Sequence, residues 1–245
     1  MKILLNYNNH NSLNNDLNSL EDTNIILCKE NSDNDHIENM HMHYNYPEDN
    51  YITDNLVFHL DGIDCNSSTW VDKINGVTFN MYNITKDGQR VYFNGSSSYG
   101  STSSVINYNY SSSTIEVVLY KTVRAGFVFD PVNGNAIRYI QGGSYVNFTY
   151  GVSGKRSAIQ DQGLNKIFVH SINMDREIFN GTTYSFTSSD SWGGQGSGTF
   201  IGKRGNNTNY FKGYIYQIRI YNRKLSLKEI MYNQLIDKKR YNITF

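Results

Sequence analysis

The sequence predicts an all-β protein: a sandwich of two antiparallel sheets with one short C-terminal helix and an N-terminal arm. Short runs of β-branched and aromatic residues alternate with clusters of Asn, Ser and Gly, and the 245 residues include only two prolines. One such run, from Tyr214 to Tyr221, is followed directly by a helix-capping signal. Many short strands separated by turns are typical of a sandwich or barrel, and this length is sufficient to bury a core.

Residues 1–50 differ in composition from the rest and form the predicted arm. They hold nine acidic and two basic residues, a charge of −7, which leaves +7 for residues 51–245 because the chain has 22 of each sign. Short strands are expected at 2–7 and 24–28, with Leu13, Leu17 and Leu20 at helical spacing between them. Because the segment has too few apolar residues for a core of its own, we expect neighbouring subunits of a larger assembly to hold it.

The C-terminal strand and helix give the most specific local signals. Between Tyr214 and Tyr221 the alternation predicts a half-buried strand, with Tyr216, Ile218 and Ile220 on one face and Gln217 and Arg219 on the other. Three groups of residues predict the helix and its start. Ser226 with Glu229 forms a capping box, Leu225 with Ile230 forms a hydrophobic staple, and the helix has an apolar stripe of Leu227, Met231 and Leu235.

The stretch from Gly198 to Asn233 resembles the end of laminin G-like domains in the concanavalin A-like lectin and glucanase superfamily. Blocks in the family order precede it at 56–64, 70–79, 91–100, 113–122 and 166–186, so the resemblance covers most of residues 51–245. One departure is Phe168, where these domains commonly have tryptophan. The resemblance implies a jelly-roll sandwich in which Trp70 is structural, and Asp72 is expected to hold the turn after it through backbone hydrogen bonds.

Several classes of function are disfavoured. Lys and Arg are scattered over the strands, apart from a group at 238–240 that closes the predicted helix, so we expect no nucleic-acid partner. No apolar run approaches the roughly 20 residues of a membrane span, and "MKILLNYNNHN" lacks the apolar core of a signal peptide, so we expect no membrane insertion. The two cysteines, Cys28 and Cys65, are expected to be free thiols.

Aromatic and amide side chains in loops are the candidate ligand contacts, because rings stack on sugars and amides bond their hydroxyls. Trp192 lies among small residues that cannot bury it locally, although a tryptophan that plugs the end of the sandwich is an equal alternative. A solvated turn is the favoured alternative for the second loop. The candidates are Asp190, Trp192 and Gln195 in the first loop and Arg204, Asn206, Asn207 and Tyr210 in the second.

Catalysis and metal binding have weak support. Retaining glucanases need two carboxylates about 5 Å apart, and the strand at 113–120 offers only Glu116. Asp175 and Glu177 fall at an expected hairpin end, where we expect them to be solvated. We therefore expect no enzyme. Asp130 could bind calcium through its carboxylate, but before Pro131 it is more typical of a residue that opens a turn. His41 and His43 lack a nearby third ligand for a transition metal. We therefore expect no cofactor, with calcium as the alternative.

The favoured function is adhesion without catalysis. The sandwich would bind a cell-surface glycan or another surface polymer, and the arm would anchor it in a homo-oligomeric assembly. The frequent Asn, Tyr and Ile and the absence of a signal sequence suit a protein on a bacteriophage virion surface, such as a head fibre, capsid decoration or tail-associated protein. The alternative is a cytoplasmic location, or an extracellular one without a signal peptide. The rivals are a purely structural cementing or capping protein and, third, a polysaccharide-degrading enzyme.

Overall fold

A computed structural model of the chain describes residues 50–109, 112–123, 164–173, 175–184 and 198–244, together with several shorter segments. The shorter segments are 4–5, 26–27, 126–131, 137–139, 141–142, 145–146, 153–157 and 186–191. Between 137 and 157, and over 186–191, only the backbone is described. The chain divides into two compact units, Met1–Ile52 and Thr53–Phe245. In the first unit, β1 (Leu4–Leu5) pairs in parallel with β2 (Ile26–Leu27), at both expected strand positions, whereas residues 13–20 lie outside the described part.

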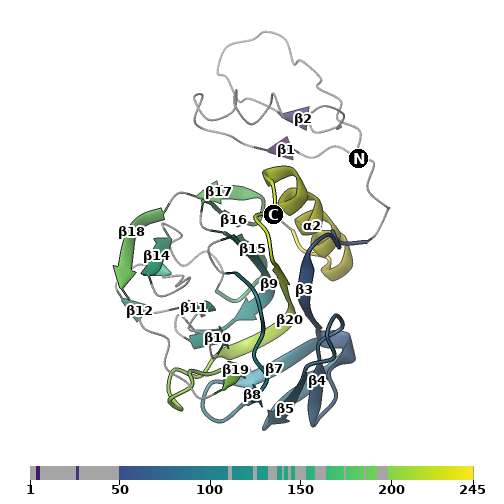
Figure 1. The fold of residues 1–245 in the computed structure, drawn as a ribbon, viewed down its shortest axis with the longest axis vertical. Coiled ribbons are helices and arrows are strands. Elements are labelled where there is room, and N and C mark those ends of the chain that lie inside the picture. Colours follow the sequence, from purple (N-terminus) through teal and green to yellow (C-terminus); the bar gives the residue numbers. More distant parts are fainter. Residues whose placement is uncertain are drawn as a thin grey trace. The chain divides into compact units, whose positions relative to one another are not determined.

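The second unit is the predicted all-β sandwich of two antiparallel sheets (Figure 1). In order, the smaller sheet contains β11 (Ile137–Tyr139), β10 (Gly126–Asp130), β19 (Thr199–Ile201), β8 (Tyr99–Thr102), β5 (Thr78–Tyr82) and β4 (Thr69–Val71). The larger sheet contains β17 (Thr182–Tyr184), β16 (Glu177–Phe179), β15 (Ile167–Ile172), β9 (Thr114–Lys121), β20 (Lys212–Tyr221), β7 (Arg90–Asn94) and β6 (Thr85–Asp87), with β3 (Leu56–Asp61) also on β20. Two further two-stranded sheets pair β12 (Gln141–Gly142) with β13 (Tyr145–Val146), and β14 (Ser153–Ser157) with β18 (Phe186–Ser191).

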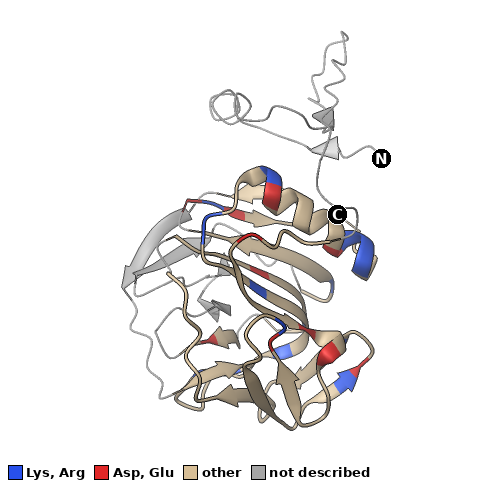
Figure 2. Cartoon of the chain, turned by 45° about the vertical axis from the view of Figure 1, so that its right-hand side comes forward, with Lys and Arg blue, Asp and Glu red and all other residues tan. Residues whose placement is uncertain are grey.

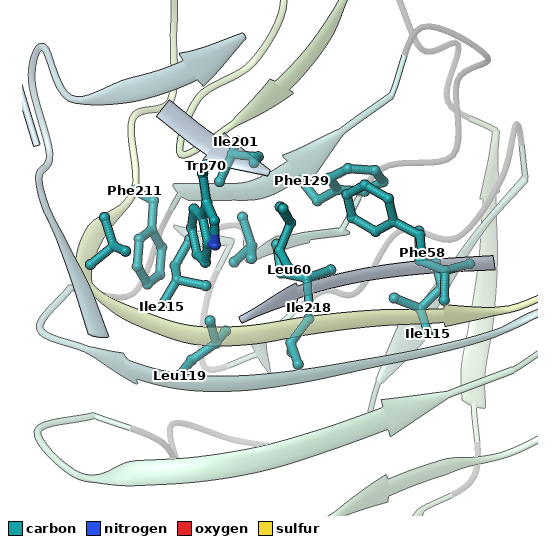
Figure 3. Close-up of a cluster of buried hydrophobic side chains, with 14 of the residues drawn as sticks. Phe58, Leu60, Trp70, Ile115, Leu119, Phe129, Ile201, Phe211, Ile215 and Ile218 are labelled. Atoms are coloured by element: carbon teal, nitrogen blue, oxygen red, sulfur yellow. The ribbon is translucent and has the colours of Figure 1, made fainter. Parts of the chain in front are cut away.

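The core lies between the two sheets (Figure 3). Phe58, Leu60 and Ile218 of the larger sheet point toward Trp70 and Phe129 of the smaller one, and all five side chains are fully buried. The Trp70 indole Nε1 donates a hydrogen bond to the Asp61 carbonyl at 2.8 Å, which satisfies its one polar group. The structural role expected for Trp70 is therefore confirmed.

The turn after β4 is held by Asp72, as predicted. Its Oδ1 accepts from the backbone N–H of His59 at 2.7 Å, and its Oδ2 accepts from that of Asn75 at 2.8 Å. A buried carboxylate that accepts several backbone N–H groups fixes both the turn and its distance from β3.

A bulge in β20 changes the faces of the last strand. Tyr216 and Gln217 together oppose Val118 of β9, because the pairing shifts by one residue after Ile215. Ile215 and Ile218 both face the core, while Tyr216 joins the outer cluster of Val118, Val169, Tyr241 and Ile243. The prediction that Tyr216 shares a face with Ile218 and Ile220 was therefore wrong, and so was that of a half-buried strand, because β20 is buried on both faces from Ile215 onward.

The helix α2 (Leu227–Tyr241) covers the outer face of the larger sheet (Figure 1). Its capping box is confirmed: the Glu229 N–H donates to Ser226 Oγ at 3.3 Å, and the Ser226 N–H donates to Glu229 Oε2 at 2.8 Å. The predicted stripe of Leu227, Met231 and Leu235 is wrong, since these side chains are only half-buried. The buried positions are Ile230, Tyr232, Asn233, Gln234, Ile236, Asp237 and Tyr241.

Polar contacts dock α2 because it meets a sheet face that itself carries buried charges. Arg219 of β20 donates from Nε to Glu116 Oε2 of β9 at 3.0 Å, and from Nη1 and Nη2 to the Asp237 carboxylate of α2 at 2.9 and 2.5 Å. Asn233 donates to Glu116 Oε2 at 2.8 Å, and Gln217 also accepts from Arg219. We call Glu116, Gln217, Arg219, Asn233 and Asp237 the Arg219 cluster; each is at most 1% exposed.

Candidate functional site

The loop between β19 and β20 contains four of the predicted site residues. Arg204 donates its backbone N–H to the Thr208 carbonyl, and Asn207 donates its own to the Arg204 carbonyl, both at 3.0 Å, which closes a tight turn. Asn207 and Asn209 adopt positive φ angles of 61° and 53°, a conformation that asparagine tolerates better than most residues. The turn expected for this loop is present, and we call residues 203–210 the 203–210 loop.

Asp130 fixes this loop to the smaller sheet. Its Oδ2 accepts the backbone N–H of Gly205 at 2.8 Å, and its side chain is buried. The carboxylate therefore has a structural role at the end of β10. Among the described residues, no three His, Cys, Asp or Glu side chains are grouped as metal ligands would be, and His41 and His43 lie outside them.

Next to the loop, two tyrosines stack across neighbouring strands on the outer face of the smaller sheet. Tyr82 of β5 and Tyr99 of β8 pair in register, with ring centroids 4.6 Å apart and ring planes inclined by 20°. Tyr82 is 42% exposed, whereas Tyr99 is half-buried. The pKa of Tyr99 is raised, mainly by burial and in addition by the phenols of Tyr82 and Tyr210.

Lys203 lies against the inner end of this stack. Its Nζ is 3.8 Å from the Tyr99 ring centroid and 4.5 Å from that of Phe200, and it donates a hydrogen bond to Asn207 Oδ1. The residue is only 4% exposed, and burial lowers its pKa. A cation between two rings stabilises them electrostatically and holds the stack in one place. We call Tyr82, Tyr99, Phe200, Lys203 and Asn207 the tyrosine patch.

The structure brings some of the predicted site residues to the tyrosine patch and leaves others apart. Asn207 belongs to the patch through its bond to Lys203, and the phenol of Tyr210 is one of the groups that raise the pKa of Tyr99. The Arg204 guanidinium instead lies 6.0 Å from the Phe127 ring centroid, and Asn206 is exposed and accepts from Thr208 Oγ1 at 2.5 Å. Trp192 and Gln195 lie outside the described residues, as does the side chain of Asp190, whose backbone pairs in β18 with Gly154.

The three strands that contribute to the patch, and their neighbour β4, contain no charged residue. No Asp, Glu, Lys or Arg occurs in β4, β5, β8 or β19, and their ribbons are tan in Figure 2, whereas charges gather on α2 and around β6 and β7. The outward side chains include Thr69, Asn80 and Ser101, which form one row across β4, β5 and β8. Hydroxyl and amide groups beside exposed rings are the usual lining of a neutral polar ligand site.

The described part of the chain gives no positive sign of catalysis. Glu116 is fully buried beneath α2, and burial raises its pKa. Asp175 lies at the β15–β16 hairpin end, exposed and paired with Lys224 at 2.8 Å, as expected. The prediction that Glu177 is solvated was wrong: it is fully buried, with Oε1 2.5 Å from His170 Nε2, because it already belongs to β16 and faces inward.

The fold agrees with two groups of solved structures. *Trypanosoma rangeli* sialidase in complex with sialic acid aligns with a TM-score of 0.54 and 16% identity over 78% of this chain and 34% of the sialidase chain. The binding domain of botulinum neurotoxin DC, in complex with rat synaptotagmin II, aligns with a TM-score of 0.52 and 16% identity over 76% of this chain and 52% of that one. The shared feature is the β-sandwich fold.

The likeness to these structures extends to the fold alone. This chain spans about a third of the sialidase chain (34%) and about half of the neurotoxin chain (52%). No protein-family model matches the sequence, and neither does any curated protein. Within the described residues, no helix has the length and apolar character needed to cross a membrane. Fold alone does not determine function, which depends on the side chains at the site.

Proposed function

We propose that the lectin-like sandwich is a non-catalytic binding module for a glycan or another surface polymer, and that the tyrosine patch contributes its contact surface. The observation that carries this proposal is the stack of Tyr82 on Tyr99, fixed by Lys203, on the outer face of the smaller sheet next to its uncharged edge strand β4. Aromatic rings bind the C–H face of a sugar, and a rigid ring loses little conformational entropy on binding. The 203–210 loop adds Asn207 and Tyr210, and we keep Asp190, Trp192, Gln195, Arg204 and Asn206 as candidate contacts around it.

A glycan array tests this function. Wild-type protein is expected to bind, and Tyr82→Ala is expected to weaken binding by about 1 to 2 kcal/mol because the stacking surface is lost. Trp192→Ala is expected to weaken it likewise if the first loop, with Asp190 and Gln195, contributes. Tyr120→Ala is the matched control, because Tyr120 is a half-buried strand tyrosine that packs edge-on at 5.8 Å against Tyr214, in the other sheet.

The outcomes separate the three functional classes. Binding that none of the variants changes would remove the tyrosine patch from the proposal, and a wild type that binds no glycan would leave the purely structural rival. Turnover on a panel of polysaccharides would revive the enzyme, which requires carboxylates outside the described residues or a rearranged Glu116. In the structure Glu116 is held by Arg219 and Asn233 and lies under α2, which argues against that class.

We further propose that residues 1–50 anchor the module to neighbouring subunits of a homo-oligomeric assembly, with a phage virion surface as the setting. The supporting observation is charge: the arm carries −7 and the remainder +7, so the arm of one copy is complementary to the body of another. The module would then act as a head fibre, capsid decoration or tail-associated protein. Calcium is kept as an alternative cofactor at Asp130, although its carboxylate already accepts from Gly205.

Deletion of residues 1–50 tests the anchor. The truncated chain is expected to stay folded, since the core of Figure 3 draws on residues after 55, but to be lost from purified particles of the assembly. Incorporation is measured by quantitative immunoblotting of the particles, and folding by the thermal unfolding midpoint. A truncated chain that is retained at the wild-type level would remove the anchoring role.

A further inference from the structure

The tyrosine patch has one open ring face, and its direction follows from the stack. Tyr99 occupies one face of Tyr82, and Lys203 lies over the Tyr99 ring, so Phe200, Lys203, Tyr99 and Tyr82 form a column that begins at the 203–210 loop. The second face of Tyr82 points away from β8, toward β4, at the exposed end of this column. Any ligand that stacks on the column must therefore do so on that face.

Strand register shows what surrounds this face. Thr69 pairs with Asn80, and the Met81 N–H donates to the Ser68 carbonyl at 2.8 Å, so the pairing continues beyond the end of β4. The chain bends at residues 67 and 68, where the Asn66 N–H donates to the Thr69 carbonyl at 2.9 Å, so Ser67 lies in a turn at the end of this pairing. Ser67, Ser68 and Asn80 are all exposed. The open ring face is thus bordered by short hydroxyl and amide side chains.

Some of these polar groups are held in place and others remain available. Asn66 Oδ1 accepts from the backbone N–H groups of Ser68 at 2.8 Å and Thr69 at 2.6 Å, which fixes the segment before β4. Within the described part of the chain, the side chains of Ser67, Asn80 and Ser101 make no hydrogen bond to protein. They can therefore bond the hydroxyl groups of a ligand without breaking existing contacts.

We propose that this face of Tyr82 binds an uncharged pyranose of a neutral polysaccharide, with Ser67 and Asn80 bonding the sugar hydroxyls. This rests on the proposed glycan-binding function and names its ligand class. Charge complementarity supports it: β4, β5, β8 and β19 contain no charged residue, and Lys203 is buried and bonded to Asn207. These four strands therefore offer an acidic sugar no exposed cation and a cationic ligand no carboxylate.

Saturation-transfer NMR on the full chain tests the assignment with neutral cello- and manno-oligosaccharides, and with oligogalacturonate as the anionic probe. The neutral probes are expected to receive saturation at their ring C–H protons, and oligogalacturonate is not. Titration of a neutral probe is expected to show about a tenfold weaker affinity for Tyr82→Ala and little change for Tyr82→Phe, which keeps the ring. Affinity is expected to be insensitive to added salt, because no ion pair is formed.

The remaining outcomes are decisive and distinguish this inference from the function. Binding of oligogalacturonate alone, or neutral binding that Tyr82→Ala leaves intact, overturns the assignment while the array result still supports a glycan module. No binding to any probe or array overturns both. A wild-type dimer in analytical ultracentrifugation that Tyr82→Ala converts to monomer would assign the face to a second copy instead. Equal thermal midpoints of the three proteins show that each result concerns binding and not folding.

Discussion

Replacing Arg219 by alanine is expected to lower the free energy of unfolding by about 3 to 5 kcal/mol, because two carboxylates would lose the charge that compensates them. Arg219 binds Glu116 at 3.0 Å and Asp237 at 2.9 and 2.5 Å, and all three side chains are almost completely shielded from water. The substitution leaves Glu116 and Asp237 buried together with like charge. Urea denaturation followed by circular dichroism measures the effect.

Two comparisons make this result interpretable. Arg223 also pairs with two carboxylates, Asp54 at 2.8 Å and Glu229 at 2.6 Å, but it is 24% exposed, so Arg223→Ala is expected to cost only about 1 kcal/mol or less. Combining Arg219→Met with Glu116→Gln and Asp237→Asn removes the charges together and should be more stable than Arg219→Ala alone. A loss below about 1 kcal/mol for Arg219→Ala, or a triple variant no better than it, contradicts the electrostatic explanation.

The unfolding free energy is also expected to fall by about 2 to 3 kcal/mol between pH 7 and pH 4.5 through a single residue, His59. Burial first, then the positive charge of Arg219, lower the pKa of His59 from 6.5 to about 3. Between these values the unfolded chain binds a proton and the folded protein does not, so stability is lost as the pH falls, at about 1.4 kcal/mol per pH unit.

The contribution of His59 is isolated by comparison with His59→Gln, which cannot titrate. Other charges near His59 are Asp61, Lys73 and Arg240, and they are present in both proteins, so the difference between the two pH profiles reports His59. We expect the difference to be flat above pH 7 and to change steadily from about pH 6.5 to pH 4, as measured by urea unfolding at each pH. Parallel profiles over that interval would show that His59 does not remain neutral in the folded protein.

Local sequence signals predicted those parts of the fold that depend on neighbouring residues. The sandwich class, the capping box of Ser226 and Glu229 and the turn of Asp72 were all predicted correctly, because each needs only a short pattern. The faces of β20 were not, because one extra residue in the strand reverses the alternation, and its position depends on pairing with β9. The buried face of α2 was also mispredicted, because its partners on the sheet are charged.

The candidate site was predicted less completely, because it too depends on pairing between strands that are distant in the sequence. The polar and aromatic composition of the 203–210 loop predicted contacts there, and Asn207 does bond Lys203 of the tyrosine patch. Tyr82 and Tyr99 were missed, since only the register between β5 and β8 makes them neighbours. The alternation of exposed and buried residues in β5 is a signal that Tyr82 faces outward, but it does not identify the ring opposite.

The position of β20 has a consequence for biosynthesis. This strand lies between β9 on one side and β7 and β3 on the other, yet it is the last strand of the chain, and α2 follows it. The larger sheet therefore stays open until residues 212–221 have been synthesised and have left the ribosome, and its buried charges stay exposed until α2 emerges. Since the pairings of β20 with β3, β7 and β9 join residues far apart in the sequence, this sheet has long-range contacts of the kind that slow folding, and it cannot be completed before β20 is available.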